Sequence, residues 1–170
     1  GGTWEFAGGK LHVDCVDKRG VTIWLTRDVP TDLIVDYAGT CYPPSTGRNF
    51  NLFFCARGRG GRSMAEETEL SGKYQLYHEL PNYIFTLTCG HTRMRRDPGF
   101  LEQSELMLGS VDQHRYRIQV IKRGRRLQAV IDGRLIHDWT DPDPHGPGWV
   151  GLRTWNTKIT YDHWAIYAPS

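Results

Sequence analysis

The last third of the chain constrains the fold most strongly. Apolar and polar residues alternate over residues 116–139, and again over residues 148–155 and 159–168. A period of two is typical of strands that bury one face, and the glycines and prolines between the blocks indicate turns. Asp132 and Gly133 separate two such runs, and this pair favours a two-residue hairpin because both central positions take a positive φ. We therefore expect antiparallel strands here.

Shorter alternating blocks fill the rest of the chain, and no long amphipathic helix is evident. A length of 170 residues suits one domain, so residues 1–170 are predicted to form a single domain. The predicted fold is all-β: a two-sheet antiparallel β-sandwich of jelly-roll type, with one sheet curved around a cleft. Strands are expected over residues 49–56, at the centre, and over 76–80, whereas 101–110 suggests a helical turn or an irregular loop. The predicted core positions are Trp24, Phe53, Leu87, Val120, Val130, Ile131, Leu152 and Ile166.

The amino-acid composition indicates which classes of ligand the chain can bind. Six Trp, eight Tyr and six Phe suit buried strands, and open sheet faces use such rings to stack on sugars. A net charge of +2 is too small to indicate a nucleic-acid partner. Sixteen Arg stand against five Lys, and the planar guanidinium pairs bidentately with carboxylates. The arginines thus indicate either an acidic ligand or a general bias from codon usage or thermal adaptation.

The chain contains no stretch that resembles a membrane span, and no signal peptide is visible. Because an opening Gly1-Gly2 can result from processing, both the bacterial cytoplasm and secretion stay open as localisations, and so does the oligomeric state. Cys15, Cys41, Cys55 and Cys89 lack zinc-site spacing. Four cysteines permit two disulfides in three pairings, although Cys55 and Cys89 are expected to be small buried residues.

The closing blocks resemble the concanavalin A-like lectin/glucanase superfamily. The matching features are the hairpin at Asp132-Gly133, the segment GWVGLR at 148–153 and the segment YDHWAIY at 161–167. The resemblance implies a jelly roll, but lectins, hydrolases, lyases and adhesion modules all share this fold.

The middle of the chain resembles the YesU-like bacterial family, a domain of unknown function in that superfamily. The resemblance rests on NLFFCA at 51–56, YQLYH at 74–78, Asn82, and RMRR at 93–96 before Gly99-Phe100. It implies a role in plant-polysaccharide breakdown without supplying a mechanism. Relative to that family the chain is short at its N-terminus, which implies that an outer strand is missing.

One group of residues fits the requirements of a polysaccharide lyase. Such an enzyme neutralises a uronate carboxylate with Arg or Asn, and it removes the C5 proton with His or Tyr. On a strand, Tyr74 and His78 share a face about 13 Å apart, and Tyr77 faces the other way. We therefore expect His78 and Tyr74 to be catalytic. The expected substrate-binding residues are Asn82, Arg93, Arg95, Tyr77 and Asn51. A purely structural role is equally consistent with the sequence. In that case Tyr74 and Tyr77 are aromatic residues of the sheet, and His78 is a polar residue whose hydrogen bonds are made within the protein.

Other kinds of site are less well supported. The Glu-x-Asp-x-x-Glu pattern of retaining glycosidases on this fold is absent, and the acids of 66–69, 79, 102 and 105 are scattered. No Asp-x-Asp-x-Asp-Gly loop occurs, so we expect no metal and no cofactor, although a structural calcium stays open. The longest loop, residues 57–72, is of a kind that often forms a functional lid or edge.

The sequence therefore predicts a carbohydrate-active protein whose partner is an oligosaccharide or polysaccharide, acidic in the favoured interpretation, with neither nucleic acid nor membrane. The first hypothesis is an enzyme, lyase or hydrolase, that cleaves a glycosidic bond in a uronate-containing glycan. The second is a non-catalytic, lectin-like carbohydrate-binding domain. The third is a structural or adhesion sandwich that binds no sugar.

Overall fold

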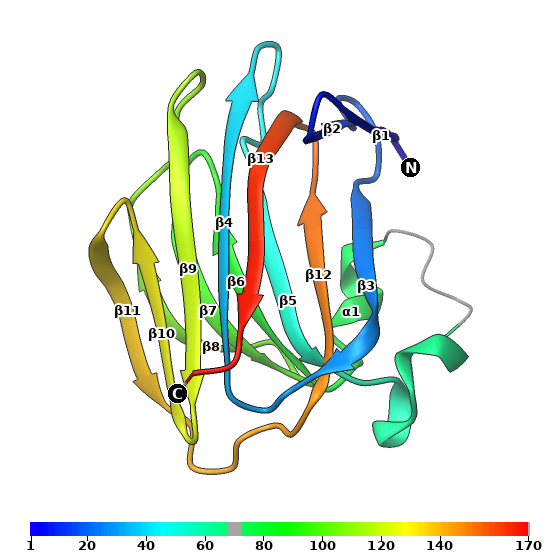
Figure 1. Ribbon diagram of the computed structural model, residues 1–170, viewed down its shortest axis with the longest axis vertical. Helices are drawn as coiled ribbons and strands as arrows, with labels where there is room; N and C mark the ends of the chain where they lie inside the picture. Colours follow the sequence, from blue (N-terminus) through cyan, green and yellow to red (C-terminus); the bar gives the residue numbers. More distant parts are fainter. Residues whose placement is uncertain (68–72, 170) are drawn as a thin grey trace.

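The computed structural model describes residues 1–67 and 73–169, which form two packed antiparallel sheets (Figure 1). The seven-stranded sheet has the order β1 (Thr3–Ala7), β2 (Lys10–Asp14), β13 (Lys158–Tyr167), β4 (Leu33–Tyr42), β9 (Arg115–Arg123), β10 (Arg126–Ile131) and β11 (Arg134–Thr140). The six-stranded sheet has the order β3 (Val21–Val29), β12 (Gly148–Thr154), β5 (Phe50–Ala56), β6 (Asn82–Leu87), β7 (Thr92–Asp97) and β8 (Leu101–Leu106). The predicted all-β sandwich is confirmed.

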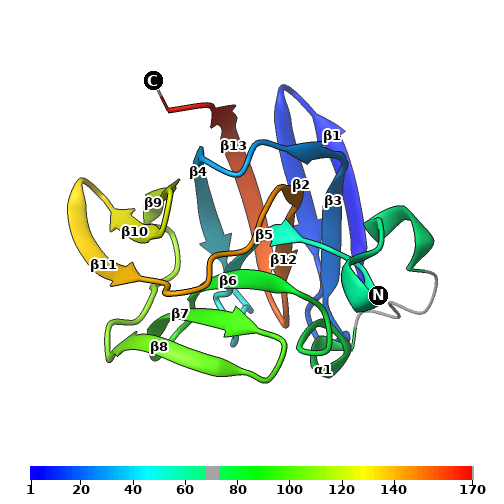
Figure 2. The ribbon, with the colours of Figure 1, turned by 90° about the horizontal axis from the view of Figure 1, so that it is seen from below.

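Helical structure among these residues is limited to short turns. They are the helix α1 (Tyr74–Tyr77) and the 3₁₀ turns η1 (Arg59–Gly61) and η2 (Met64–Glu66). In Figure 2, α1 lies on the outer side of the six-stranded sheet, away from the seven-stranded sheet. No helix in the described part of the chain is long and apolar enough to cross a membrane.

The alternation of β5 divides its side chains between two clusters. Phe50, Leu52 and Phe54 face the other sheet and belong to the main core. Phe53 points to the outer face, where it is fully buried with Tyr77 of α1 and Ile84 of β6. Because β5 lies between β12 and β6, it is central to its sheet, as expected.

The core prediction is confirmed at five of its eight positions. Phe53, Leu87, Val120, Ile131 and Leu152 are buried. The remaining three positions, Trp24, Val130 and Ile166, are only half-buried. Neighbouring residues of a strand face opposite ways, so Val130 and Ile131 cannot both point into the core. Trp24 lies on β3, an edge strand, and packs on the outer face instead.

The hairpin prediction is also confirmed. Asp132 and Gly133 join β10 to β11 with φ values of 49° and 78°. A positive φ strains most residues but suits Asp and Gly, which explains why this pair forms the turn.

Two expected elements are wrong. Residues 76–80 do not form a strand, because α1 and a following turn occupy this segment. Leu101–Leu106 is a strand, β8, and neither a helical turn nor an irregular loop. Its polar composition hid it, yet charged residues are common on edge strands because they discourage pairing with other chains.

The loop over 57–72 is anchored where the structure describes it. The side chain of Glu67 is 2% exposed, and its Oε2 lies 2.8 Å from Nη1 of Arg59. Met64 is buried against Leu80 and Ala56. Residues 68–72 lie outside the described residues, so the lid hypothesis for this part of the loop stays a prediction.

All four cysteines carry free thiols, so neither disulfide is formed. Cys55 is buried as expected, whereas the expectation for Cys89 is wrong because Cys89 is exposed.

Candidate ligand-binding cleft

A cleft of about 640 Å³ lies on the outer face of the six-stranded sheet. Strand register explains its polar floor, because Arg153, Asn51, Thr86 and Arg93 are consecutive cross-strand partners on β12, β5, β6 and β7. All four residues line the cleft. Its volume is typical of small-molecule sites.

The next cross-strand row is largely apolar, and α1 covers it. It consists of Gly151, Phe53, Ile84 and Arg95. The ring of Tyr77 stacks on Phe53 with 4.9 Å between centroids. The helix thus buries the apolar row and leaves the polar row open to a ligand.

Two further contacts fix this cover in place. The ring of Trp24 lies so close to Gly151 that a Cβ there would be 2.5 Å from it, which makes glycine necessary at this position. Asn82 is 1% exposed, and its Nδ2 donates to the carbonyls of Tyr77 and Leu80 at 3.0 and 2.7 Å. Asn82 therefore supports the turn after α1 and does not line the cleft.

Arg95 and Tyr74 form one wall of the cleft. Nη2 of Arg95 donates to the hydroxyl of Tyr74 and, at 3.0 Å, to Oγ1 of Thr86. The guanidinium carbon of Arg95 lies 4.6 Å from the ring centroid of Phe100, which also lines the cleft. Burial raises the pKa of the Tyr74 phenol, although Arg95 and Arg153 act in the opposite direction. The phenol is therefore neutral at pH 7.

The charge of Arg95 is buried and lacks an acidic partner. Arg95 is 2% exposed, and no carboxylate among the described residues forms an ion pair with it. Its Nε is buried without a hydrogen-bond partner in the same part of the chain. A buried charge costs several kcal/mol unless an opposite charge offsets it. Arg95 is therefore a candidate anion-binding group.

Arg93 lines the same cleft, but unlike Arg95 it is paired with carboxylates. Its guanidinium lies 2.5 Å from Oε1 of Glu105 and 3.2 Å from Oε2 of Glu102. These carboxylates neutralise Arg93. No acid is among the described residues that line the cleft, whereas Arg19, Lys73, Arg93, Arg95 and Arg153 all line it. The cleft is therefore cationic.

His78 lies behind this wall. Its Nδ1 donates to Oδ2 of Asp97 at 2.8 Å, and Asp97 is fully buried. The imidazole meets the rings of Tyr74 and Phe100 edge-on, with centroids 4.5 and 4.2 Å away. The expected separation of about 13 Å between Tyr74 and His78 on a strand is wrong, because a helical turn brings the two residues together. His78 packs on two walls of the cleft and does not line it.

The far part of the cleft is partly aromatic, and Arg19 lies at the same end. Asn49, Thr88 and His91 line it, together with Trp155, which is 48% exposed. Nδ2 of Asn49 donates to Oδ1 of Asn51 at 3.2 Å. Burial, and next the nearby charge of Arg93, lower the pKa of His91. His91 is thus uncharged at neutral pH.

The structure brings together only some of the predicted site residues. Tyr74, Arg93, Arg95 and Asn51 line the cleft. The other three predicted residues, Tyr77, His78 and Asn82, support α1 and the cleft wall.

Sequence reasoning missed Arg153, Phe100 and Trp155. Alternation on β12 could have indicated that Gly151, Arg153 and Trp155 share a face, but it could not show what that face meets.

None of these acids that the structure describes lines the cleft, although Glu102 and Glu105 both contact Arg93, which does. Glu79 binds Arg59 at 3.0 Å, and Glu102 binds Arg93. Glu66 and Glu67 lie in the loop after β5, and Glu69 lies outside the described residues. Within the described part of the chain, no group of three or more metal-ligating side chains occurs.

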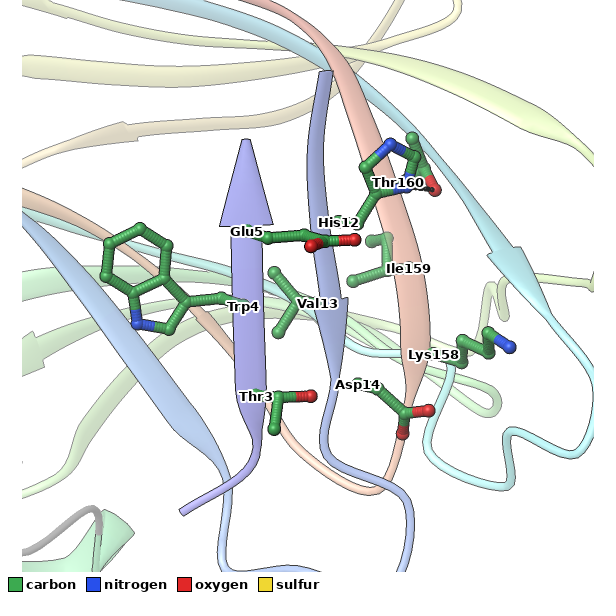
Figure 3. A pocket seen from close by; sticks show the side chains of 9 residues that line it. All are labelled: Thr3, Trp4, Glu5, His12, Val13, Asp14, Lys158, Ile159 and Thr160. Atoms are coloured by element: carbon green, nitrogen blue, oxygen red, sulfur yellow. Dashed lines mark hydrogen bonds between the residues drawn. The ribbon is translucent and has the colours of Figure 1, made fainter. Parts of the chain in front are cut away.

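A second hollow, of about 390 Å³, lies where β1, β2 and β13 meet (Figure 3). Glu5, His12 and Thr160 are register partners across it, and Nδ1 of His12 lies 3.0 Å from Oγ1 of Thr160. The polar side chains that line it are exposed or half-buried, so it lacks the buried charge that marks the cleft.

Comparisons with known proteins agree with this architecture. The model of a family described as a domain of unknown function (DUF6250) matches residues 15–164. No curated protein matches the chain. A Bacillus subtilis protein of unknown function with a galectin-like fold superposes with a TM-score of 0.87 and 20% identity, over 99% of this chain and 86% of that one.

Two further solved structures share the fold at lower identity. Carbohydrate binding module CBM66 from Bacillus subtilis has a TM-score of 0.72 and 13% identity, over 98% of this chain and 91% of that one. The exoplasmic/lumenal domain of VIP36, solved with Ca²⁺ and Man3GlcNAc, has a TM-score of 0.69 and 9% identity, over 100% of this chain and 83% of that one. These likenesses establish a galectin-like sandwich fold.

Proposed function

The chain belongs to the family described as a domain of unknown function (DUF6250), and on that premise we propose that it is a carbohydrate-recognition domain whose cleft binds an acidic oligosaccharide. The observation that carries the proposal is the buried guanidinium of Arg95, which has no carboxylate partner among the described residues. A ligand carboxylate would offset this charge through a bidentate pair.

The rest of the cleft suits a sugar. Amide and hydroxyl groups of Asn51 and Thr86 on the floor can bind sugar hydroxyls, and the rings of Tyr74 and Phe100 can pack on sugar C–H faces. The names of two structures with the same fold, a carbohydrate binding module and a mannoside-bound lumenal domain, support carbohydrate as the ligand class. The proposal includes a relationship of this chain to the YesU-like family, and the role in plant-polysaccharide breakdown that this relationship implies.

Titration calorimetry with length-matched acidic and neutral oligosaccharides tests the proposal. The acidic series should bind more tightly, and added salt should weaken it because ionic contacts at an open cleft are screened. Arg95→Met should weaken acidic binding by about tenfold or more, since hydrogen bonds to charged groups contribute about 1.5–3 kcal/mol.

Arg93→Met is the matched control. Arg93 lines the same cleft but is already paired with Glu102 and Glu105, so its loss should weaken acidic binding less than the loss of Arg95 does. Arg95→Lys, which keeps the charge, and melting temperatures of all variants separate binding from folding. Salt-insensitive binding of a neutral glycan, unchanged in Arg95→Met, would remove the acidic ligand from the proposal.

A polysaccharide lyase is the second candidate function, favoured by the contact between Tyr74 and Arg95 in the cleft. In a uronate, Arg95 would neutralise the carboxylate and the Tyr74 phenolate would take the C5 proton. The C4–O4 bond would then break as the C4=C5 double bond forms, and the phenol would return a proton to O4.

Hydrolysis by a carboxylate pair is less well supported, because no acid lines the cleft among the described residues. Ultraviolet absorbance of the product distinguishes the two reactions. Elimination forms an unsaturated uronate that absorbs, whereas hydrolysis forms new reducing ends without this absorbance. Because burial raises the pKa of Tyr74, elimination should accelerate as the pH rises above neutrality. A lack of product from any acidic polysaccharide leaves recognition as the function.

A further inference from the structure

Trp155 provides a second kind of contact surface within the cleft. It follows Arg153 by two residues, just beyond the end of β12, and 48% of it is exposed. It lines the cleft together with Asn49 and Arg153. A single exposed aromatic residue is ordinary on a protein surface, so its position and rigidity decide whether it has a role.

The turn that carries Trp155 is held rigidly. Oγ1 of Thr157 donates to the carbonyl of Trp155 at 2.6 Å and accepts from the backbone N–H of Asn49 at 3.0 Å. Oδ1 of Asn156 accepts from the backbone N–H of Asp17 at 2.8 Å, and the N–H of Gly47 donates to the carbonyl of Asn156 at 3.0 Å. The backbone beside the indole is thus preorganised, which lowers the entropic cost of binding.

The floor between Trp155 and Arg95 contains neutral polar groups in the same row as the guanidinium groups of Arg153 and Arg93. Asn49 is 4% exposed, and its Oδ1 has no hydrogen-bond partner among the described residues. Asn51 and Thr86 continue the floor toward Arg95. Amide and hydroxyl groups such as these can bind sugar hydroxyls.

Arg95 and Trp155 are carried by strands that are not neighbours. Trp155 follows β12 and Arg95 lies on β7, and β5 and β6 separate these strands. Three strand spacings amount to about 14 Å between the two backbones. A ligand that contacts both side chains runs across β5 and β6, which suits an oligosaccharide.

We propose that the cleft has two subsites, in which Arg95 and Tyr74 bind an acidic sugar and Trp155 stacks on the C–H face of a sugar further along the same glycan. This inference rests on the proposed function and adds to it the minimum length and the direction of the ligand. It assigns an acidic unit to the Arg95 end of the bound segment, and the unit at Trp155 needs an apolar face.

The test measures affinity against ligand length. Galacturonic acid and its linear dimer and trimer are titrated into the wild-type protein and into Trp155→Ala, Trp155→Phe and Arg95→Met. In the wild type, the dissociation constant should fall about tenfold or more between monomer and trimer, the scale of one aromatic contact. Trp155→Ala should abolish this gain and leave monomer binding within about twofold, while Trp155→Phe should retain part of it.

Trp164→Ala is the control, because Trp164 is 38% exposed on β13 of the other sheet. It should bind as the wild type does, and unchanged melting temperatures should show that each variant is folded. Equal affinity for monomer and trimer would overturn the second subsite, and so would a gain in affinity with length that is unchanged in Trp155→Ala. In either case, binding that still depends on Arg95 would uphold the proposed function. Absence of any binding by the wild type would overturn both.

Discussion

The guanidinium carbon of Arg153 lies 4.7 Å from the ring centroid of Tyr74, and Arg95, on another strand, donates to the hydroxyl of the same ring. One aromatic side chain therefore contacts two buried cations. Cations are attracted to the face of such a ring, so Tyr74 helps to hold both guanidinium groups at the cleft wall.

Substitution of Tyr74 separates the role of its ring from that of its hydroxyl. Tyr74→Phe keeps the cation–π contacts and should weaken ligand binding less than Tyr74→Ala, because it removes only the hydrogen bond that the charged guanidinium of Arg95 donates. Tyr74→Ala removes the wall and should weaken binding by more than about tenfold. Calorimetry measures both. If the protein is a lyase, Tyr74→Phe should bind substrate and release no unsaturated product.

His78→Ala tests the catalytic hypothesis for the histidine. A general base contributes about 10²–10⁴-fold to a rate, so the catalytic role predicts that activity falls by that factor while binding persists. Because His78 packs on Tyr74 and Phe100 and does not line the cleft, we expect instead that binding itself weakens. Parallel measurements of affinity and turnover decide between the two.

Phe53→Ala should destabilise the fold strongly. Phe53 is fully buried and stacks on Tyr77, and truncation of such a ring costs about 3–5 kcal/mol. Urea denaturation gives the change in the free energy of unfolding. Leu101→Ala is the control, since Leu101 is 49% exposed on an edge strand. An unchanged midpoint for Phe53→Ala would refute the role of the outer cluster.

Stability should fall with acid through His137. This residue is 1% exposed between Oγ of Ser104 and Oγ1 of Thr92, and burial lowers its pKa from 6.5 to about 4. Because the unfolded chain takes up the proton first, the neutral histidine stabilises the fold above pH 6.5, and this contribution disappears as the pH falls to about 4. The full loss is at most about 3 kcal/mol.

The measurement is urea denaturation at several pH values for the wild type and for His137→Gln. The difference between the two in the free energy of unfolding should shrink as the pH falls from 6.5 to about 4. A difference independent of pH would contradict the assignment.

Removal of divalent cations should leave ligand binding unchanged. No cluster of three metal-ligating side chains is found among the described residues, and the described lining of the cleft is cationic. Dissociation constants measured in EDTA and in calcium chloride should therefore agree. A calcium-dependent affinity would indicate a metal site and revive the structural calcium that the sequence leaves open.

The sandwich could be predicted because its strands carry local signals. Alternation and the Asp132-Gly133 turn are visible within short windows of sequence, and the structure confirms both. A single turn of helix carries no such periodicity, so the sequence predicts a strand where α1 forms. Since α1 buries Tyr77 and turns His78 behind the cleft wall, this one error misplaced two of the seven predicted site residues.

The cleft itself depends on cross-strand register, which one sequence does not reveal. Arg153 and Arg93 are 60 positions apart in the numbering, yet they share one row through Asn51 and Thr86. Alternation predicts which residues share a face of a strand, but not which strands are neighbours. Arg95 was identified by its chemistry, whereas Arg153 and Trp155 become visible only when the sheet is assembled.

Because α1 packs on its own small cluster, local opening of α1 is separate from unfolding of the sandwich. The main core lies between the sheets, whereas Tyr77 and Phe53 form a cluster on the outer face. A segment held this way can open locally while the sandwich stays intact. The amides of His78 and Leu80, which bond to the carbonyls of Gln75 and Tyr77, should therefore exchange with solvent faster than those of β5. A ligand that presses on Tyr74 should slow that exchange, so protection there would reveal an occupied cleft before the ligand's identity is known.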